Sequence, residues 1–432
     1  MEYCKLQIGC MLVILYIILM YYLERGRLRQ KHKNKVFEFL LWQSATCVLL
    51  DGITAVTVNH LDVVPTWLNQ ILHMMFLVSI DLVIFLLLLY TLSITSRLPK
   101  SRRGNLLLWM PFVINMILVL VFIPSLTYCQ GAITNYSMGI SAYTCFVMIA
   151  IYLLVSIIMV LKHWRYIKHH KRISIMTYLI VLLCVTTVQM VFPQTLISSI
   201  ATTMFVLGAY MNQENPVMEE LAKYHIEMIM GFATLVENKD GSTGGHVKRT
   251  TKYVELLANE LQHRGIYREE LTKDYIDNLA LAAPMHDVGK ISIPDAILQK
   301  PGKLTDEEFA RMKQHAANGG KIIRETFGHL REAEYTEMAY QVARFHHEKW
   351  NGKGYPDGLS QKEIPLCARI MAIADVFDAV SEKRCYRDAM PLERCFEIIE
   401  EGSGQDFDPT LVEVFMDIRD KVEEVHKHIE TV

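Results

Sequence analysis

Histidines and aspartates gather in five short stretches of the second half of the sequence, three of them as single residues and two as adjacent pairs. Imidazoles and carboxylates without a thiolate partner suit iron, manganese or zinc better than calcium or magnesium. The stretches therefore predict a metal centre. Its candidate ligands are His246 in GGHVKR, His286 and Asp287 in HDVGK, His315 in MKQHAANGG, His346 and His347 in HHEKWNGKGYPDG, and Asp375 in IADVFDAVSEKRCYR.

The adjacent pair His286 and Asp287 restricts how the centre can be built. Neighbouring residues point about 100° apart around a helix axis, so both reach one metal only if their helix passes close beside it. A bridging Asp287 would let that helix serve two metals. Asp378, one helical turn beyond Asp375, is expected either to support a ligand or to cap a helix. The other histidines of this half, His225, His263, His329, His426 and His428, are expected to be solvated or structural.

Helices must position these residues, because the segments from residue 219 onward carry helical periodicity and no useful strand alternation. Thr305 followed by Glu308 predicts a capping box at a helix start. His315 then lies late in that helix, ahead of the expected breaker pair Gly319 and Gly320. The expected class is all-α: a polytopic transmembrane helical bundle followed by an all-helical domain.

Composition divides the 432 residues into two halves, although the net charge is only −2. Residues 1–211 hold 16 of the 44 Lys and Arg but 6 of the 46 Asp and Glu, so residues 212–432 hold 28 against 40. An acidic soluble half argues against sequence-independent binding to a DNA or RNA polymer, which is driven by neutralising phosphates. A small anionic ligand or a metal is compatible with this charge balance.

The first half contains apolar stretches of the length that crosses a bilayer, about 20 residues each, although the last is short. They predict seven spans. These cover residues 6–23, 36–58, 68–94, 106–123, 140–161, 173–191 and 195–210.

Basic residues alternate between the loops that connect these spans. The loops at 25–35, 97–103 and 162–172 are rich in Lys and Arg, whereas 59–66 and 124–139 contain none. Because basic loops face the cytoplasm, the N-terminus is expected outside and everything after residue 210 inside. The expected location is a cell membrane, with a multi-pass anchor, the lipid bilayer as partner and a cytoplasmic C-terminal domain.

Ionisable residues also occur inside the predicted spans. Asp51 lies in the second span, and His73 and Asp81 lie in the third. An ionisable group in hydrocarbon is costly enough to suggest a function, such as sensing a ligand or a proton. The alternative is a carboxylate that faces other helices and accepts hydrogen bonds from Ser, Thr or Gln.

The expected organisation has three parts: residues 1–211 as a sensor region, 212–237 as a linker or signalling helix, and 224–432 as a cytoplasmic domain with the predicted metal centre. Apolar residues after Pro216 recur at mostly three- and four-residue spacing, which would suit a short dimer-forming helix. The pattern is brief, so packing against the following domain is the alternative. A second copy of the chain, forming a homodimer, is therefore one of the expected partners.

The motifs HDVGKISIPD and HHEKWNGKGYP resemble those of the HD-GYP phosphodiesterases, a branch of the HD phosphohydrolase superfamily that cleaves cyclic di-GMP. The resemblance covers about residues 224–418. It implies that the seven residues named above bind two divalent ions, iron or manganese, with Asp287 as the bridge and as a catalytic residue. It also implies that Lys290 contacts the scissile phosphate, and that Tyr355, Arg384 and Arg387 bind the substrate. The alternative for the two arginines is a solvated basic face.

Two departures from the family pattern bear on the metal site. Members with a third metal carry a Glu four residues before the position of His246, where this sequence has Ser242. Two metals are therefore expected, because Glu237, nine residues before His246, could reach the site only if the intervening loop folds back. Asn351 replaces an Asp that is often found in the signature loop.

The resemblance implies a membrane-anchored, metal-dependent phosphodiesterase of the bacterial inner (cell) membrane that hydrolyses cyclic di-GMP to pGpG, with GMP as the product of a second cut. A non-catalytic cyclic di-GMP receptor is the alternative from another class, and a hydrolase of another cyclic dinucleotide is a third. The complete ligand set favours hydrolysis over the receptor. Sequence alone does not separate the nucleotides.

Overall fold

The computed structural model describes residues 2–27, 34–94, 101–239, 245–329, 333–382 and 389–430. The chain divides into two compact units, Met1–Leu221 and Ala222–Val432. The boundary falls within helix α8, Pro216–Lys239, and inside the segment predicted as a linker. Within the described residues the only paired strands are two of three residues each, so the predicted all-α class is confirmed.

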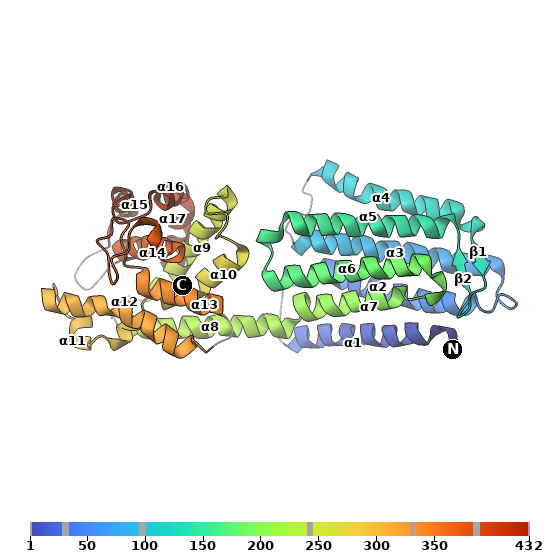
Figure 1. Ribbon diagram of the computed structural model, residues 1–432, viewed down its shortest axis with the longest axis horizontal. Helices are drawn as coiled ribbons and strands as arrows, with labels where there is room; N and C mark the ends of the chain where they lie inside the picture. The colour runs from blue at the N-terminus through green and yellow to red at the C-terminus, as the bar shows by residue number, and fades with distance from the viewer. Residues whose placement is uncertain are drawn as a thin grey trace. The chain divides into compact units, whose positions relative to one another are not determined.

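Long helices lying side by side build the first unit (Figure 1). A short antiparallel hairpin, β1 (Thr127–Cys129) and β2 (Tyr136–Met138), precedes α5. A π-helical segment over Tyr210–Glu214 follows the last helix of the bundle. The helices are α1 (Lys5–Arg27), α2 (Lys35–Thr57), α3 (Thr66–Ile94), α4 (Arg102–Phe122), α5 (Ile140–Lys162), α6 (His169–Val191) and α7 (Ser198–Ala209).

Six helical segments among the described residues are long and apolar enough to cross a membrane, and they correspond to α1 to α6. The seventh predicted span forms α7, which has 12 residues. At a rise of 1.5 Å per residue this helix measures about 18 Å, well short of a bilayer core of roughly 30 Å. The π-helical segment Tyr210–Glu214 continues it by 5 residues. The structure thus supplies six spans of full length, and the seven-span topology stays a prediction.

The outer surface of this bundle is apolar. On α4, Leu106 and Leu107 are each 69% exposed and Val121 is 61% exposed. A run of exposed large apolar side chains would be costly in water, whereas hydrocarbon accepts it. The first unit is therefore suited to insertion in a lipid bilayer.

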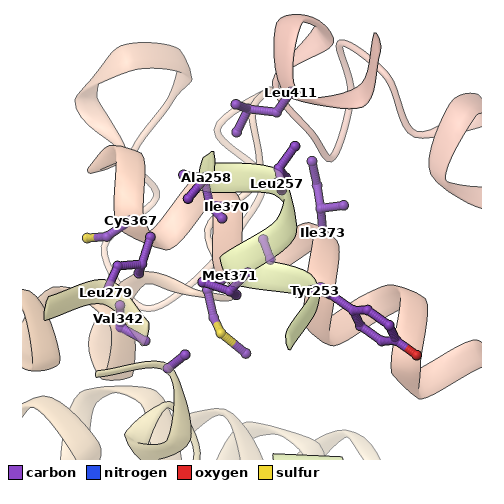
Figure 2. Packing of buried hydrophobic residues seen from close by; sticks show 14 of the residues in the cluster. Tyr253, Leu257, Ala258, Leu279, Val342, Cys367, Ile370, Met371, Ile373 and Leu411 are labelled. Carbon is purple, nitrogen blue, oxygen red and sulfur yellow. The ribbon is translucent and has the colours of Figure 1, made fainter. Parts of the chain in front are cut away.

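The second unit packs its helices around one large apolar core. Tyr253 and Leu257 of α9 meet Ile370 and Ile373 of α14 in this core, as Figure 2 shows. Two short 3₁₀ helices, Ala283–Met285 and Val288–Ser292, flank His286 and Asp287. The helices are α9 (His246–Arg264), α10 (Lys273–Ala282), α11 (Asp295–Leu298), α12 (Asp306–Phe327), α13 (Ala333–Phe345), α14 (Leu366–Ser381), α15 (Leu392–Glu401), α16 (Pro409–Asp417) and α17 (Arg419–Glu430).

Helix α12 begins as the sequence predicts. The capping box of Thr305 and Glu308 is present, with each side chain bonded to the other residue's backbone N–H. The expectation that Gly319 and Gly320 end the helix is wrong, because α12 continues to Phe327. Both glycines are buried, and a Cβ on Gly320 would lie 3.0 Å from the Tyr340 ring. These residues therefore allow close packing of α12 against α13 instead of ending the helix.

A buried ion pair ties α14 to α16. Arg369 Nη1 donates to Asp408 Oδ2 at 2.7 Å, and the Tyr267 hydroxyl donates to the same oxygen at 2.7 Å. Asp408 also caps α16 by accepting from Thr410 N. One carboxylate thus serves a cation, a phenol and a helix end.

Candidate metal centre

The predicted ligands come together in two groups of three. One group contains His246, His286 and Asp375, and the other contains His315, His346 and His347. Within each group the ligand atoms all lie within 4.8 Å of one another. They come from α9, the turn after α10, α12, the end of α13 and α14, so five separate segments converge on one place.

Asp287 lies between the two groups and faces each with a different oxygen. Its Oδ2 is 3.2 Å from His286 Nε2, whereas its Oδ1 is 3.5 Å from His315 Nε2 and 3.9 Å from His346 Nε2. A carboxylate placed in this way can contribute one oxygen to a cation in each group. This arrangement supports the bridging role that the sequence predicts.

Three of the imidazoles are oriented by backbone carbonyls. His286 Nδ1 bonds to Ala283 O at 2.9 Å, His315 Nδ1 to Met312 O at 2.7 Å, and His346 Nδ1 to Val342 O at 3.0 Å. A carbonyl only accepts, so each Nδ1 carries the proton. In the neutral ring the lone pair then lies on Nε2, which is the arrangement that a metal-binding histidine needs.

His246 is oriented by a carboxylate instead. Its Nδ1 lies 2.8 Å from Asp378 Oδ2, and Arg249 holds Asp378 through two bonds of 2.7 and 3.0 Å. All three side chains are buried. Of the two roles that the sequence allowed for Asp378, support of a ligand is the one that the structure shows. Arg249 was missed, although it stands three residues after His246 on the same helix face.

A close backbone approach sets the distance between Asp287 and α12. A Cβ on Gly289 would lie 1.9 Å from His315 O and 2.5 Å from Gly319 N. Any side chain at this position would therefore push the 3₁₀ helix Val288–Ser292 away from α12. Glycine in the HDVGK motif is what allows Asp287 and His315 to face each other.

The charge states also suit cation binding. Burial lowers the pKa of His346 and His347 well below the usual value, so both rings are neutral. Burial would raise the pKa of Asp287, but the positive charges of Lys290 and His286 hold it well below its usual range. The centre thus presents neutral imidazoles beside an ionised carboxylate.

His286 behaves differently from the other rings. Burial would lower its pKa, but the neighbouring charges of Asp287 and Asp375 raise it to about 9. A divalent cation that binds between these carboxylates would displace the proton from His286.

The orphaned ring nitrogens provide a test of whether a metal fits. The Nε2 atoms of His315 and His346 are fully enclosed and have no hydrogen-bond partner among the described residues. A buried acceptor without a donor is costly, and these two point at the same carboxylate oxygen. A divalent ion bound by the group of His315, His346 and His347 would satisfy both nitrogens, and an imidazole-rich donor set suits iron, manganese or zinc. The residues present therefore fit a metal centre.

Lys290 and Tyr355 border the centre. Lys290 Nζ lies 2.7 Å from Asp287 Oδ2, and the Tyr355 ring lies 4.8 Å from the His347 ring. Arg384 and Arg387, predicted to bind the substrate, lie outside the described residues.

The loop that carries Tyr355 is held by carboxylates that sequence reasoning missed. Buried Glu348 accepts from the backbone N–H groups of Asp357 and Gly358, and Arg344 forms two bonds with Asp357. Asn351 accepts from Lys353 N at 2.9 Å, as an aspartate would, so the substitution keeps the local turn.

Glu237 lies beside the start of α9. Its Oε1 accepts from His246 N at 2.9 Å, and the side chain is buried. Glu237 therefore lies against the backbone of His246, an approach that the expectation of two metals did not assume. Ser242, on which the expectation of two metals depends, lies outside the described residues.

The remaining histidines follow their expected roles. His225, His263, His329 and His428 are exposed. His426 is buried, and its Nδ1 lies 3.1 Å from the Tyr253 hydroxyl.

Comparison with known proteins finds a similarity to HD domains in the second unit. The profile of the HD domain family matches residues 232–411. A cyclic di-GMP phosphodiesterase of Vibrio cholerae is 44% identical over 200 residues, which cover 46% of this chain and 41% of that protein. A cyclic di-GMP phosphodiesterase of Thermotoga maritima is 35% identical over 208 residues, which cover 48% and 53%.

A relative with another named substrate is also similar. A 3'3'-cGAMP-specific phosphodiesterase of Vibrio cholerae is 39% identical over 201 residues, which cover 46% of this chain and 36% of that protein. The chain thus spans about half or less of the length of these curated relatives.

Proposed function

We propose that this chain, whose residues 232–411 match an HD domain, is a membrane-anchored, metal-dependent phosphodiesterase that hydrolyses cyclic di-GMP. The observation that carries the proposal is the pair of ligand groups joined by Asp287. Relatives named as cyclic di-GMP phosphodiesterases add support. Six long apolar helices support the membrane anchor.

Divalent ions bound by the two groups would supply Lewis acidity and a hydrolytic nucleophile at neutral pH. The chain's own residues arrange the rest of the site. Asp287 lies between the two groups and directs one oxygen to each. The backbone carbonyls that bond to Nδ1 of His286, His315 and His346 keep each Nε2 directed toward the centre. Rigid placement of this kind lets a site act without rearranging its ligands during the reaction.

Lys290 is proposed to contact the scissile phosphate. Its ammonium lies at the centre beside Asp287, and its side chain is mostly buried. A fixed positive charge there would offset the negative charge that builds on the phosphoryl oxygens. Tyr355, whose ring lies beside that of His347, is proposed to border the nucleotide. Arg384 and Arg387, which lie outside the described residues, are proposed to hold it. Cleavage at a 3′ oxygen would give linear pGpG, and a second cleavage would give GMP.

A second candidate substrate comes from the relatives. The protein named as a 3'3'-cGAMP-specific phosphodiesterase is 39% identical to this chain, close to the value for the cyclic di-GMP enzymes. The two nucleotides differ in one base, whereas the metal centre acts on the phosphodiester. The same centre therefore suits both substrates.

The full chain, purified anaerobically in lipid nanodiscs with Fe(II) or Mn(II), should be incubated with each cyclic dinucleotide and the products separated by chromatography. We expect pGpG from cyclic di-GMP. The rate of 3'3'-cGAMP cleavage relative to that of cyclic di-GMP shows which nucleotide is preferred. Asp287→Asn should be inactive. Glu325→Gln, which removes an exposed carboxylate from the helix that carries His315, is the matched control. Tight cyclic di-GMP binding without turnover at full metal occupancy would instead establish a receptor.

A further inference from the structure

The first unit contains a cavity of about 100 Å³ among its helices. Its lining comes from α2, α3, α5, the hairpin strand β2 and the segment between α6 and α7. A water needs roughly 10–15 Å³ on this measure, so the cavity has room for a molecule of several non-hydrogen atoms.

A buried carboxylate borders this cavity. Asp51 is 3% exposed, and no cationic side chain of the described residues pairs with it. Its donors are Gln7, Ser198 and Ser199, and all three bond to Oδ2. Oδ1 is left without a donor within the described part of the chain. A carboxylate of this kind is expensive to bury without a counter-charge.

Two further acceptors line the same cavity. His73 Nδ1 bonds to Asn69 O at 2.8 Å and so carries the ring proton, which leaves Nε2 as an acceptor in the neutral ring. Asn135 Nδ2 donates to Val58 O, and its Oδ1 accepts no hydrogen bond from the described residues. By contrast, the Gln189 side chain is occupied by Ile197 N and Pro193 O. The polar part of the lining therefore offers three acceptors that no described donor fills, beside the hydroxyls of Tyr136 and Ser137, which can accept as well as donate.

The apolar part of the lining contains aromatic rings. Phe76, Tyr136 and Phe146 border the cavity together with aliphatic side chains such as Leu77. Aromatic faces attract cations, and aliphatic walls exclude strongly hydrated ones. Ca²⁺ and Mg²⁺ take six or more oxygen ligands, which this lining does not provide.

We propose that the cavity between Asp51, His73 and Asn135 binds a small organic ammonium ion. A primary ammonium group carries three N–H donors and one positive charge. The donors match the acceptors of Asp51, His73 and Asn135, and the positive charge matches the uncompensated charge of the Asp51 carboxylate. Its hydrocarbon part would lie against the aromatic and aliphatic walls. This site lies wholly in the first unit and does not depend on the proposed hydrolytic activity. It gives the predicted sensor region a ligand class.

Calorimetric titration of the full chain in lipid nanodiscs tests the proposal, with isobutylammonium chloride as the probe and empty nanodiscs as the blank. Isobutanol has the same carbon skeleton without the charge, and sodium chloride supplies a cation without the skeleton. We expect saturable binding of isobutylammonium, with isobutanol binding at least about tenfold more weakly and no saturable heat from sodium chloride.

Variants locate the site. Asp51→Asn should weaken isobutylammonium binding at least about tenfold, and Ala142→Leu, which fills the cavity while keeping Asp51, should weaken it similarly. Asp62→Asn removes an exposed carboxylate just beyond α2 and should bind as the unchanged chain does. Circular dichroism and gel filtration select folded variants, so loss of fold in one of the two cavity variants leaves the other as a test. Equal binding of isobutanol or sodium, or unchanged binding by a folded Asp51→Asn chain, would overturn the proposal.

Discussion

His246 Nδ1 lies 2.8 Å from Asp378 Oδ2, and this contact decides which nitrogen of the ring faces the metal centre. Because the carboxylate accepts the Nδ1 proton, Nε2 keeps its lone pair and lies 3.3 Å from His286 Nε2. Arg249 in turn keeps Asp378 in place. A buried chain of three side chains thus sets the direction of one ligand.

Replacing Asp378 by Asn should weaken metal binding about 10- to 100-fold, because an amide orients the His246 ring less strongly and makes it less basic. Competitive titration of Mn(II) with a metal-sensitive dye measures the loss. Glu325→Gln serves as the control. Unchanged Mn(II) affinity in a chain with normal helical content would show that Asp378 has only a structural role.

Replacing Asp287 by Asn should abolish hydrolysis while leaving the helical content unchanged. A neutral amide is a poor bridge between two cations, because its nitrogen has no lone pair to offer a metal ion. Turnover of cyclic di-GMP and metal content per chain should be measured on the same preparation. Wild-type values for both would mean that Asp287 is not the bridging ligand.

Two metal ions per chain are expected in anaerobically prepared protein, measured by plasma mass spectrometry against protein concentration. Glu237 already accepts from His246 N, so the Glu237→Gln variant should retain both ions. Three ions in the unchanged chain that fall to two in Glu237→Gln would assign Glu237 to a third site.

The membrane topology is testable with reporters that are active only in the cytoplasm. Fusions after Val432 or within residues 25–35 should be active, and fusions within 124–139 should be inactive, because basic loops remain on the cytoplasmic side. An inverted result at any of the three points would contradict seven spans with the N-terminus outside. Inversion after Val432 alone would indicate that the short α7 does not span the membrane.

Replacing Asp408 by Asn should destabilise the second unit by about 3–5 kcal/mol, because Arg369 would remain buried without its counter-charge. Asp417→Asn, at the other end of α16, breaks a partly exposed pair with Arg264 and should cost at most about 1 kcal/mol. Urea unfolding followed by circular dichroism compares the two. Equal midpoints would show that the buried pair adds nothing beyond a surface pair.

The sequence by itself determined the residue types at the centre and the class of the fold. Short motifs such as HDVGK and HHEKWNGKGYP keep their chemistry within a few residues, so their spacing is readable directly. Helical periodicity and the capping box at Thr305 are likewise local, and the helix starts there as predicted. Apolar length also identified six of the segments long enough to cross a membrane.

Only the tertiary structure decided how these parts meet. The division of the ligands into two groups, and the direction of each Asp287 oxygen, depend on the close crossing at Gly289, which no local pattern encodes. The buried chain from Arg249 through Asp378 joins residues 129 positions apart. In the first unit, Asp51 takes donors from Gln7 and from Ser199, 148 positions away, and the cavity beside it exists only where the helices leave space. Side-chain direction and empty volume arise from packing between distant segments, so spacing along the chain does not contain them.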